Sequence, residues 1–163
     1  MELRDVYDKN KRPTGETYLK GTKLPDGKYV LIVITFIQNT NGEFLLQFTS
    51  KEKGNEWSST GGHPKAGETS KAGIRTEVLE ELGIDIPENE FEFVTTIAKE
   101  IGFVDVYYVK KDIDINEVVV QEAEVEKVKW ATMEEIETMI NNGQFQKTHS
   151  LAYKECIKYL NNK

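Results

Sequence analysis

Three glutamates, Glu77, Glu80 and Glu81, are closely spaced in the segment EVLEEL. If this segment is helical, residues three and four positions apart lie on one face, with Cβ atoms about 5 to 6 Å apart. Carboxylates that close repel one another unless a cation lies between them. Hard oxygen ligands of this kind suit Mg²⁺ or Mn²⁺, which also bind substrate phosphates. The helix alone is compatible with a solvated acidic face as well as with a metal site.

The segment before these glutamates favours the metal site. It is the glycine-rich stretch STGGHPKAGE, which ends in Glu68. A loop of this composition can fold backbone carbonyl groups and a further carboxylate toward the same helix face. We therefore expect a helix from about Ser70 to Leu82, ended by Gly83 in the left-handed conformation, with the loop beside its acidic face.

The strands expected to support this helix lie on both sides of it in the sequence. Residues 28–37 are apolar at nearly every position, as in a central strand covered on both faces. A second strand, residues 43–49, follows through Asn41-Gly42, a dipeptide that accepts the positive φ of a tight hairpin. Residues 90–111 indicate two more strands with a bend near Gly102, and residues 123–131 alternate like a half-buried strand.

Two helices are expected near the C-terminus. Thr132 and Glu135 have the spacing of a capping box, and Gly143 follows as a helix stop. Residues 148–162 form an amphipathic pattern that indicates a closing helix. Strands interleaved with helices predict a mixed sheet flanked by helices, an α+β fold in a single domain spanning residues 1–163.

The glycines and glutamates between residues 62 and 84 follow the spacing of a known pattern. Eight of its nine defined positions match: Gly62, Glu68, Glu77, Val78, Glu80, Glu81, Gly83 and Ile84. The pattern is Gly-x5-Glu-x7-Arg-Glu-U-x-Glu-Glu-x-Gly-U, with U aliphatic, and the chain thus resembles the Nudix family. The segments DVYDKNKRPTGE and QEAEVEKVKWATMEEI look like the branch that includes isopentenyl diphosphate isomerase and its hydrolase-like relatives.

This resemblance implies a Nudix α/β/α sandwich and hydrolysis of a nucleoside diphosphate linked to another group. By the same resemblance, Glu77, Glu80 and Glu81 hold one or more Mg²⁺ ions, with Mn²⁺ as an alternative and the Gly61 carbonyl as a further ligand. One of these carboxylates acts as, or orients, the base for the attacking water. Glu77 is the first candidate for that base, and Glu81 is also expected to be catalytic. Glu68 is expected to connect the loop to the helix.

A more distant glutamate often completes such sites in the family. Glu124, at the start of the strand that leads to Trp130, is the candidate here. Glu122 and Glu126 are the alternatives. Each of the three could equally be a solvated charge at the edge of the sheet.

Five further residues are candidates for binding the substrate. Trp57 could stack on a base or another flat group, although a packing role is at least as natural for tryptophan. His63, inside the loop, could contact a phosphate or act as a pH-sensitive donor, or could bond only to nearby backbone. Lys51, Lys53 and Lys65 flank the same region and are the nearest cations for phosphate oxygens.

The chain departs from the family pattern at Thr76, where the box has arginine. That arginine pairs with box carboxylates and holds them in place. Arg75 lies about 100° round the helix and cannot take over this role without distortion. Threonine has neither the charge nor the reach of arginine, so we expect less restrained glutamates and a slower rate.

A second departure lies in LLQFTSK, where relatives often have one or two arginines. Phe48, Thr49 and Ser50 occupy that region instead. Substrate phosphates then lack bidentate partners and depend on lysine point charges. Both departures remove arginine from the expected site.

Composition restricts the class of protein. A single cysteine cannot form an internal disulfide, and the charged N-terminal segment lacks the apolar stretch of a signal peptide, so we expect a soluble cytoplasmic protein. A net charge of −7 argues against nucleic-acid polymers as partners, and no apolar run could span a membrane. The expected partner is a small-molecule diphosphate; a monomer and a homodimer both remain open.

Three functions therefore compete. A Mg²⁺-dependent diphosphate hydrolase is the leading hypothesis. A Nudix-fold module that binds its ligand with weak or no turnover is the alternative that Thr76 makes credible. An isopentenyl diphosphate isomerase is disfavoured, because the chain has only His63 and His149 and lacks the cysteine and metal-binding histidines that such an isomerase needs.

Overall fold

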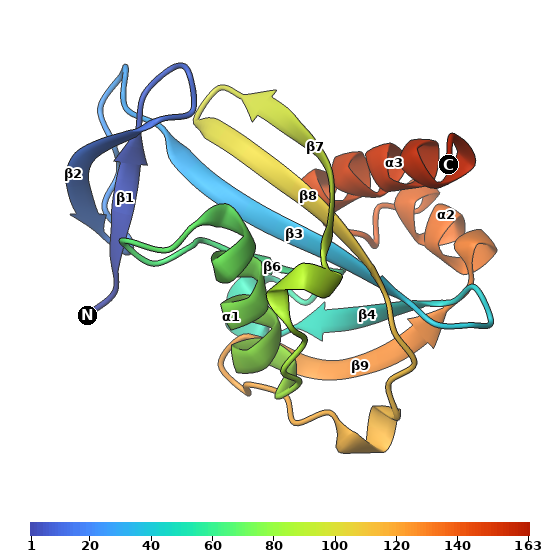
Figure 1. The fold of residues 1–163 in the computed structure, drawn as a ribbon. Coiled ribbons are helices and arrows are strands. Elements are labelled where there is room, and N and C mark those ends of the chain that lie inside the picture. The colour runs from blue at the N-terminus through green and yellow to red at the C-terminus, as the bar shows by residue number, and fades with distance from the viewer.

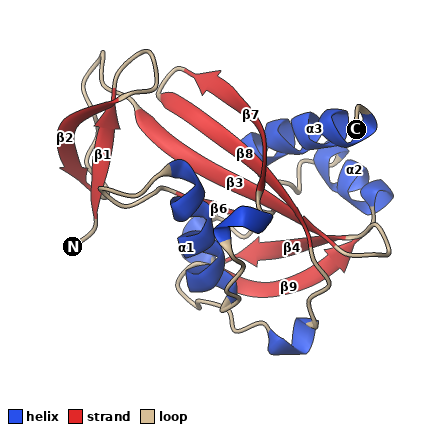
Figure 2. Ribbon diagram, viewed as in Figure 1, coloured by secondary structure: helices blue, strands red, loops and turns tan.

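The computed structural model describes residues 1–163 as a mixed sheet between helices, with a separate two-stranded sheet at the N-terminus (Figures 1 and 2). The small sheet pairs β1 (Leu3–Tyr7) with β2 (Pro13–Leu19). The strands of the large sheet are β3 (Val30–Gln38), β4 (Phe44–Thr49), β5 (Trp57–Ser58), β6 (Thr60–Gly62), β7 (Glu92–Lys99), β8 (Gly102–Lys110) and β9 (Val125–Ala131). The helices are α1 (Ser70–Leu82), α2 (Met133–Asn141) and α3 (Lys147–Asn161). The predicted sandwich is confirmed.

Strand β3 lies at the centre of the large sheet. It runs parallel to β8 from the pair Val30–Gly102 to the pair Gln38–Lys110. Because successive side chains of a strand point to opposite faces, Ile34 and Phe36 pack in the core beneath α2 and α3, while Val33 packs beneath α1. Both faces are covered, which is why this strand is apolar at nearly every position.

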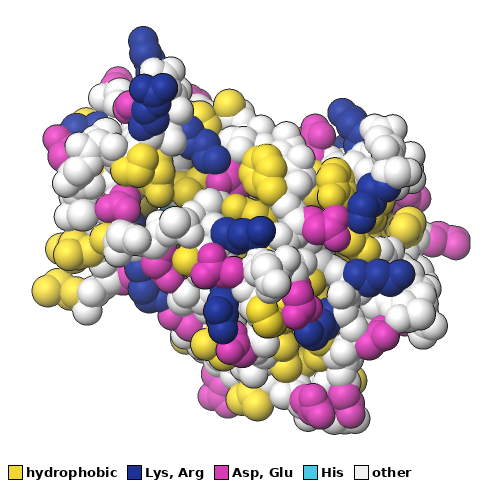
Figure 3. All heavy atoms as spheres, viewed as in Figure 1, with side chains coloured by type: hydrophobic (Ala, Val, Ile, Leu, Met, Phe, Trp, Pro, Cys, Tyr) yellow, Lys and Arg dark blue, Asp and Glu magenta, His cyan; other side chains and the backbone are white.

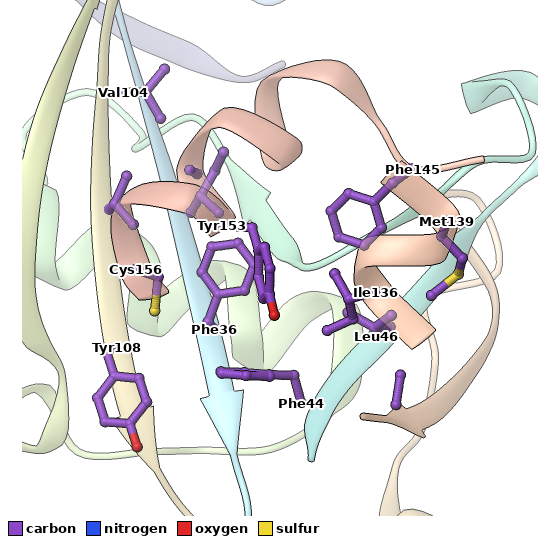
Figure 4. Close-up of a cluster of buried hydrophobic side chains, with 14 residues drawn as sticks. Phe36, Phe44, Leu46, Val104, Tyr108, Ile136, Met139, Phe145, Tyr153 and Cys156 are labelled. Atoms are coloured by element: carbon purple, nitrogen blue, oxygen red, sulfur yellow. The ribbon is translucent and has the colours of Figure 1, made fainter. Parts of the chain in front are cut away.

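The core beneath α2 and α3 is built around three aromatic rings (Figure 4). Phe36, Phe44 and Tyr153 meet edge to face, with ring centroids 5.7 to 6.1 Å apart. Such tilted pairs are favoured over face-to-face stacking because of the ring quadrupole. Cys156 is buried beside them and unpaired, in agreement with the absence of a disulfide.

The hairpin predicted between β3 and β4 is correct at its turn but not along its length. Gly42 has a φ of 82°, as the turn requires, yet only Gln38 and Phe44 pair across the two strands. The strands then diverge, and β6 pairs with β3 through Val33–Gly62 and Ile34–Gly61. The segment expected to be a loop is therefore partly strand, and it carries its glycines alongside the central strand.

The N-terminal hairpin was not anticipated from the sequence. Its strands are short, and on β2 only Tyr18 is buried, so there is little hydrophobic pattern to detect. The hairpin joins β3 through backbone hydrogen bonds between Tyr7 and Tyr29. It also contacts the loop before α1, because Ala66 N donates to Leu3 O at 2.8 Å. Its position is therefore set by long-range contacts.

The C-terminal helices form as predicted. The capping box is present, with Glu135 N donating to Thr132 Oγ1 at 3.1 Å and Thr132 N donating to Glu135 Oε1 at 2.9 Å. Gly143 has a φ of 73° just after α2. None of the helices is long and apolar enough to cross a membrane. On the face in Figure 3, acidic and basic side chains are interspersed without an extended basic area.

A largely buried histidine predicts how stability depends on pH. His149 Nδ1 lies 2.9 Å from Ser59 Oγ, and burial lowers the pKa of His149 from 6.5 to about 4. The unfolded chain therefore binds a proton at this residue below pH 6.5, where the folded protein does not. We expect this residue to lower the free energy of unfolding by about 2 kcal/mol between pH 7 and pH 5.

Urea unfolding at the two pH values checks this expectation. Between pH 7 and pH 5, the free energy of unfolding of His149→Gln should fall by about 2 kcal/mol less than that of the wild type. This difference should hold whatever the stability of the variant at pH 7. Equal pH dependence in the two proteins would contradict it. Lys154→Gln, an exposed change on the same helix, is the matched control.

Candidate functional site

Helix α1 carries the glutamates and begins and ends as its sequence predicts. Thr69 is the N-cap, with its Oγ1 accepting from Ala72 N at 3.1 Å. Gly83 ends the helix in the left-handed conformation, with a φ of 69°. Ile74 and Val78 are fully buried against the sheet. This packing fixes the rotation of the helix and so the direction of its acidic face.

Two of the three box glutamates are buried. The exposed fractions of Glu77 and Glu81 are 9% and 5%. The Glu77 carboxylate lies directly against Gly62, where an added Cβ would be only 2.4 Å from Glu77 Cδ. Gly62 in turn is held by its pairing with Val33. The glycine of β6 therefore makes the space that this carboxylate occupies.

Glu81 is held by a short chain of hydrogen bonds. Gln47 Nε2 donates to Glu81 Oε1 at 2.7 Å, and Thr60 Oγ1 donates to Gln47 Oε1 at 2.9 Å. All three side chains are buried. Gln47 and Thr60 are site residues that the sequence did not reveal, although a glutamine inside the apolar run FLLQF was a usable signal.

The electrostatics of this pair favour neutralisation by a cation. Burial, followed by the adjacent Glu81 carboxylate, raises the pKa of Glu77 well above its usual range. Burial also raises the pKa of Glu81, an effect opposed by hydrogen bonds with Glu77 and Gln47. Ionising two neighbouring buried carboxyl groups is costly, and a bound positive charge strongly stabilises their ionised forms.

Glu80 differs from its two neighbours because it is exposed. Its carboxylate accepts a hydrogen bond from Lys65 Nζ. Lys65, predicted to meet substrate phosphate, is therefore paired with a box glutamate and does not line the cleft described below. A substrate phosphate would have to compete with Glu80 for this ammonium group.

Glu68 joins the loop to the helix. Its Oε1 accepts from Lys65 N at 2.7 Å and its Oε2 accepts from Thr76 Oγ1 at 2.6 Å. Thr76 therefore contacts one box carboxylate despite its shorter reach, because the loop brings Glu68 close enough for a hydroxyl group; the slower rate expected from the missing arginine stays a prediction. Arg75 instead pairs with Asp85 on the exposed side of the helix, at 2.8 and 3.0 Å.

A cleft of about 420 Å³ lies along the acidic face of α1, and none of its lining residues is hydrophobic. The structure brings most of the predicted site residues to this cleft: Lys53, Gly61, His63, Glu77, Glu80, Glu81 and Glu124. It also brings Gly62 of the box to the cleft, and it adds residues that the sequence did not indicate: Glu2, Arg4, Lys20, Gly21 and Gln121. The cleft is therefore polar throughout.

Glu124 is the one of the three distal candidates that lines the cleft. It immediately precedes β9, and its carboxylate lies 3.3 Å from Lys53 Nζ and 3.8 Å from Lys20 Nζ. Glu122 is exposed outside the cleft. Glu126 accepts from Asn55 Nδ2 at 3.0 Å, also outside the cleft.

Trp57 and Lys51 lie outside the cleft. Gln47 faces α1, so the next residue, Phe48, faces the other side of the sheet, and Trp57 pairs with Phe48. The two rings are 5.0 Å apart between centroids, and Lys129 Nζ lies 4.3 Å from the Trp57 centroid. The predicted substrate contact of Trp57 in this cleft is not found, because strand alternation directs its ring away.

His63 lines the cleft as expected. Burial, followed by the nearby charge of Arg4, lowers the pKa of His63 to about 4. The imidazole is therefore neutral at pH 7. This corrects the view of His63 as a donor that changes charge near neutral pH.

The residues present fit a divalent cation that also binds a substrate. No three carboxylate, imidazole or thiol groups converge into a ready-made cluster, and Glu80 is engaged by Lys65. Mg²⁺, however, is commonly held by one or two carboxylates, with waters and substrate phosphates as its other ligands. Glu77 and Glu81, buried side by side with raised pKa values, supply such a donor pair.

Comparison with known proteins agrees with this site. Residues 28–153 match the NUDIX domain family. An uncharacterised Nudix hydrolase of Listeria monocytogenes, lmo0368, is 34% identical over 149 residues, covering 89% of this chain and 88% of the relative. The crystal structure of DR0079 from Deinococcus radiodurans superposes with a TM-score of 0.75 at 21% identity, covering 94% of this chain and 98% of the other.

The NUDIX domain of Shewanella oneidensis NrtR, solved in complex with ADP ribose, superposes with a TM-score of 0.68 at 16% identity, covering 86% of this chain and 92% of the other. At these identities the solved structures establish the fold, while the family match and the Listeria relative establish the family. The chain belongs to the Nudix hydrolases, enzymes that cleave phosphoanhydride bonds.

Proposed function

We propose that this protein is a Mg²⁺-dependent hydrolase that cleaves the diphosphate linkage of a nucleoside diphosphate derivative or a related organic diphosphate. The observation that carries the proposal is the burial of Glu77 and Glu81 side by side against Gly62, in a cleft without apolar lining. Such a cleft favours a charged, metal-bound ligand over an apolar one.

The metal would be held by Glu77, Glu80 and Glu81, with the Gly61 carbonyl as a further ligand. When bound there, Mg²⁺ or Mn²⁺ would supply positive charge to neutralise substrate phosphates and to stabilise negative charge on the leaving oxygen. Glu77 is the proposed base for the attacking water.

Three further residues assist in this proposal. Gln47 keeps the Glu81 carboxylate in place through its 2.7 Å hydrogen bond. Glu124 borders the cleft, and Lys53 beside it can bind a phosphate oxygen. Together they surround the position in which the reacting phosphates would lie.

A substrate panel tests this function. The protein is incubated with nucleoside diphosphate sugars, dinucleoside polyphosphates and nucleoside triphosphates, with Mg²⁺, with Mn²⁺ or with EDTA, and products are separated by anion-exchange chromatography. We expect metal-dependent cleavage of at least one compound and none with EDTA. Cleavage that persists in EDTA would contradict the metal dependence.

A ligand-binding module with weak turnover is the second candidate, and Thr76 in place of the box arginine is the observation that favours it. The NrtR domain solved with ADP ribose provides a Nudix fold with a bound nucleotide ligand. If no compound is cleaved but some raise the melting temperature of the protein in the presence of Mg²⁺, the module is the correct function.

The hydrogen bond from Thr76 to Glu68 gives a further prediction. Thr76→Val keeps the shape of the side chain but removes the hydroxyl group that joins the helix to the loop. We expect kcat/KM to fall about 5- to 10-fold, the equivalent of one hydrogen bond of roughly 1 kcal/mol or slightly more. Steady-state kinetics measure this.

The control for this change is Thr76→Ser, which retains the hydroxyl group. Its kcat/KM should stay within about twofold of the wild-type value. If Thr76→Val and Thr76→Ser have the same kcat/KM, the hydrogen bond to Glu68 has no role in turnover.

A further inference from the structure

The N-terminal hairpin lies outside the part of the chain that matches the family, yet it forms one wall of the cleft. The family match begins at residue 28, whereas β1 and β2 lie within residues 3–19 and form a sheet of their own. Four lining residues come from this hairpin and its flanks: Glu2, Arg4, Lys20 and Gly21. Figure 1 shows the hairpin beside the start of α1, away from α2 and α3.

Without the hairpin, the cleft has too little positive charge for a diphosphate. Among lining residues within the matched part of the chain, Lys53 is the one lysine or arginine, and it already lies 3.3 Å from Glu124. The end of β4 and the residue after it, Phe48, Thr49 and Ser50, add no cation. The hairpin adds Arg4 and Lys20 to the same cleft.

The Arg4 side chain is largely buried at the edge of the cleft, unlike a solvated surface charge. Its side chain is 13% exposed, and its Nε donates to Glu2 Oε2 at 2.6 Å. Arg4 also forms a side-chain hydrogen bond with Tyr18, its partner across the hairpin. A guanidinium group has five N–H donors, so these two partners leave donors that can bind a phosphate. Lys20 is half exposed and lies 3.8 Å from Glu124, a distance that leaves its ammonium group free to bind a ligand.

A buried ion pair fixes the far end of the hairpin to the body of the protein. Lys11, in the turn between β1 and β2, places its Nζ 2.8 Å from Asp105 Oδ1. Asp105 lies on β8, is fully buried and also accepts hydrogen bonds from Ser70 and Thr96, each at 2.6 Å. A charge that is removed from water needs such partners, and losing one of them is costly.

This ion pair and the cleft lie at opposite ends of one small sheet. The pair also touches the start of α1, because Ser70 is the first residue of that helix. A change in the Lys11–Asp105 contact therefore alters how the hairpin sits against α1. The position of Arg4 over the acidic face depends on that arrangement.

We propose that the β1–β2 hairpin is a substrate-binding element of this enzyme, in which Arg4 and Lys20 bind the phosphates of the substrate and Lys11 is a positioning residue that acts through Asp105. The inference rests on the proposed function, because it assigns phosphate binding at the same site. From outside the matched domain, the hairpin supplies positive charge to a cleft whose matched part contributes only Lys53.

The test uses methylenediphosphonate, a diphosphate analogue that is not hydrolysed, with Mg²⁺ and the full-length protein in isothermal titration calorimetry. We expect Kd to be 10- to 100-fold higher for Arg4→Gln than for the wild type, about the effect of losing a charged hydrogen bond. Arg12→Gln is the matched control, because it removes the same charge from the exposed turn of the same hairpin. Its Kd should equal that of the wild type.

Two results would overturn the inference: equal Kd values for Arg4→Gln and Arg12→Gln, or no binding of methylenediphosphonate by the wild type. The assay needs no turnover, so it is independent of the substrate panel. If the panel shows no cleavage while the Arg4 and Arg12 variants still differ, the proposed hydrolysis fails and the binding role of the hairpin stands.

The positioning role of Lys11 has its own measurement. Lys11→Met should raise Kd for methylenediphosphonate severalfold, and raise KM more than it lowers kcat, while Lys11→Arg should restore most of the affinity. Lys9→Met, an exposed change nearby in the same turn, should bind like the wild type. A Lys11→Met protein with a lower melting temperature but unchanged Kd would show that the ion pair only stabilises the fold.

Discussion

Glu77→Gln is expected to reduce kcat by about three orders of magnitude, because the amide has nearly the same shape but is a poor ligand for Mg²⁺ and cannot accept a proton. The melting temperature should not fall. Glu77 and Glu81 are buried together and both have raised pKa values, so Glu77 favours its neutral form in the protein without metal, and a neutral amide of the same shape fits in its place. Kinetics on the best compound of the panel, with thermal melting, measure the two effects.

The result for Glu77→Gln is interpreted against two other changes. Glu81→Gln should reduce kcat to a similar degree, since its carboxylate is equally buried and is held by Gln47. Glu137→Gln, an exposed change on α2, should have no effect. Wild-type rates in both the Glu77 and the Glu81 variants would show that this face of α1 is not the catalytic site.

Gly62→Ala is expected to lower kcat strongly, although less than either glutamate substitution. The new Cβ would lie 2.4 to 2.7 Å from all three atoms of the Glu77 carboxyl group. That group is the end of a flexible side chain, so it can rotate away at small cost to stability. We expect kcat to fall about 100-fold, the effect of displacing a catalytic group by roughly 1 Å.

Gly61→Ala provides the contrast to Gly62→Ala. Its Cβ would lie 2.6 Å from the carbonyl oxygen of Val33 and 3.0 Å from the Ile34 side chain. A backbone atom of the central strand cannot move aside easily, so here the melting temperature should fall. The two neighbouring glycines should therefore separate loss of catalysis from loss of stability. A Gly62→Ala enzyme with wild-type kcat would show that Glu77 does not need its observed position.

The acidic helix was predictable because its determinants are local. Thr69 caps the N-terminus of α1 and Gly83 ends the helix at its C-terminus. The spacing of Glu77, Glu80 and Glu81 places them on a common face within a little more than one turn. Helix α1 covers one face of β3 and helices α2 and α3 cover the other, and this left a continuous apolar run in the sequence.

The rest of the cleft depends on contacts between distant segments. Arg4 and Gln47 reach the acidic face only because the N-terminal hairpin and β4 pack against it, and no spacing in the sequence records this packing. Trp57 illustrates the converse. It is close to the loop in sequence, but strand alternation places its ring on the other side of the sheet. Proximity along the chain was a poor guide to the direction of a side chain.

The absence of hydrophobic residues from the cleft has a consequence for inhibitors. A small molecule usually gains affinity from apolar surface that it buries, and no hydrophobic side chain lines this cleft. Tight inhibitors must instead be anionic groups that hold the metal and Arg4 together, such as bisphosphonates. Since charge supplies their affinity, their potency should weaken as ionic strength rises.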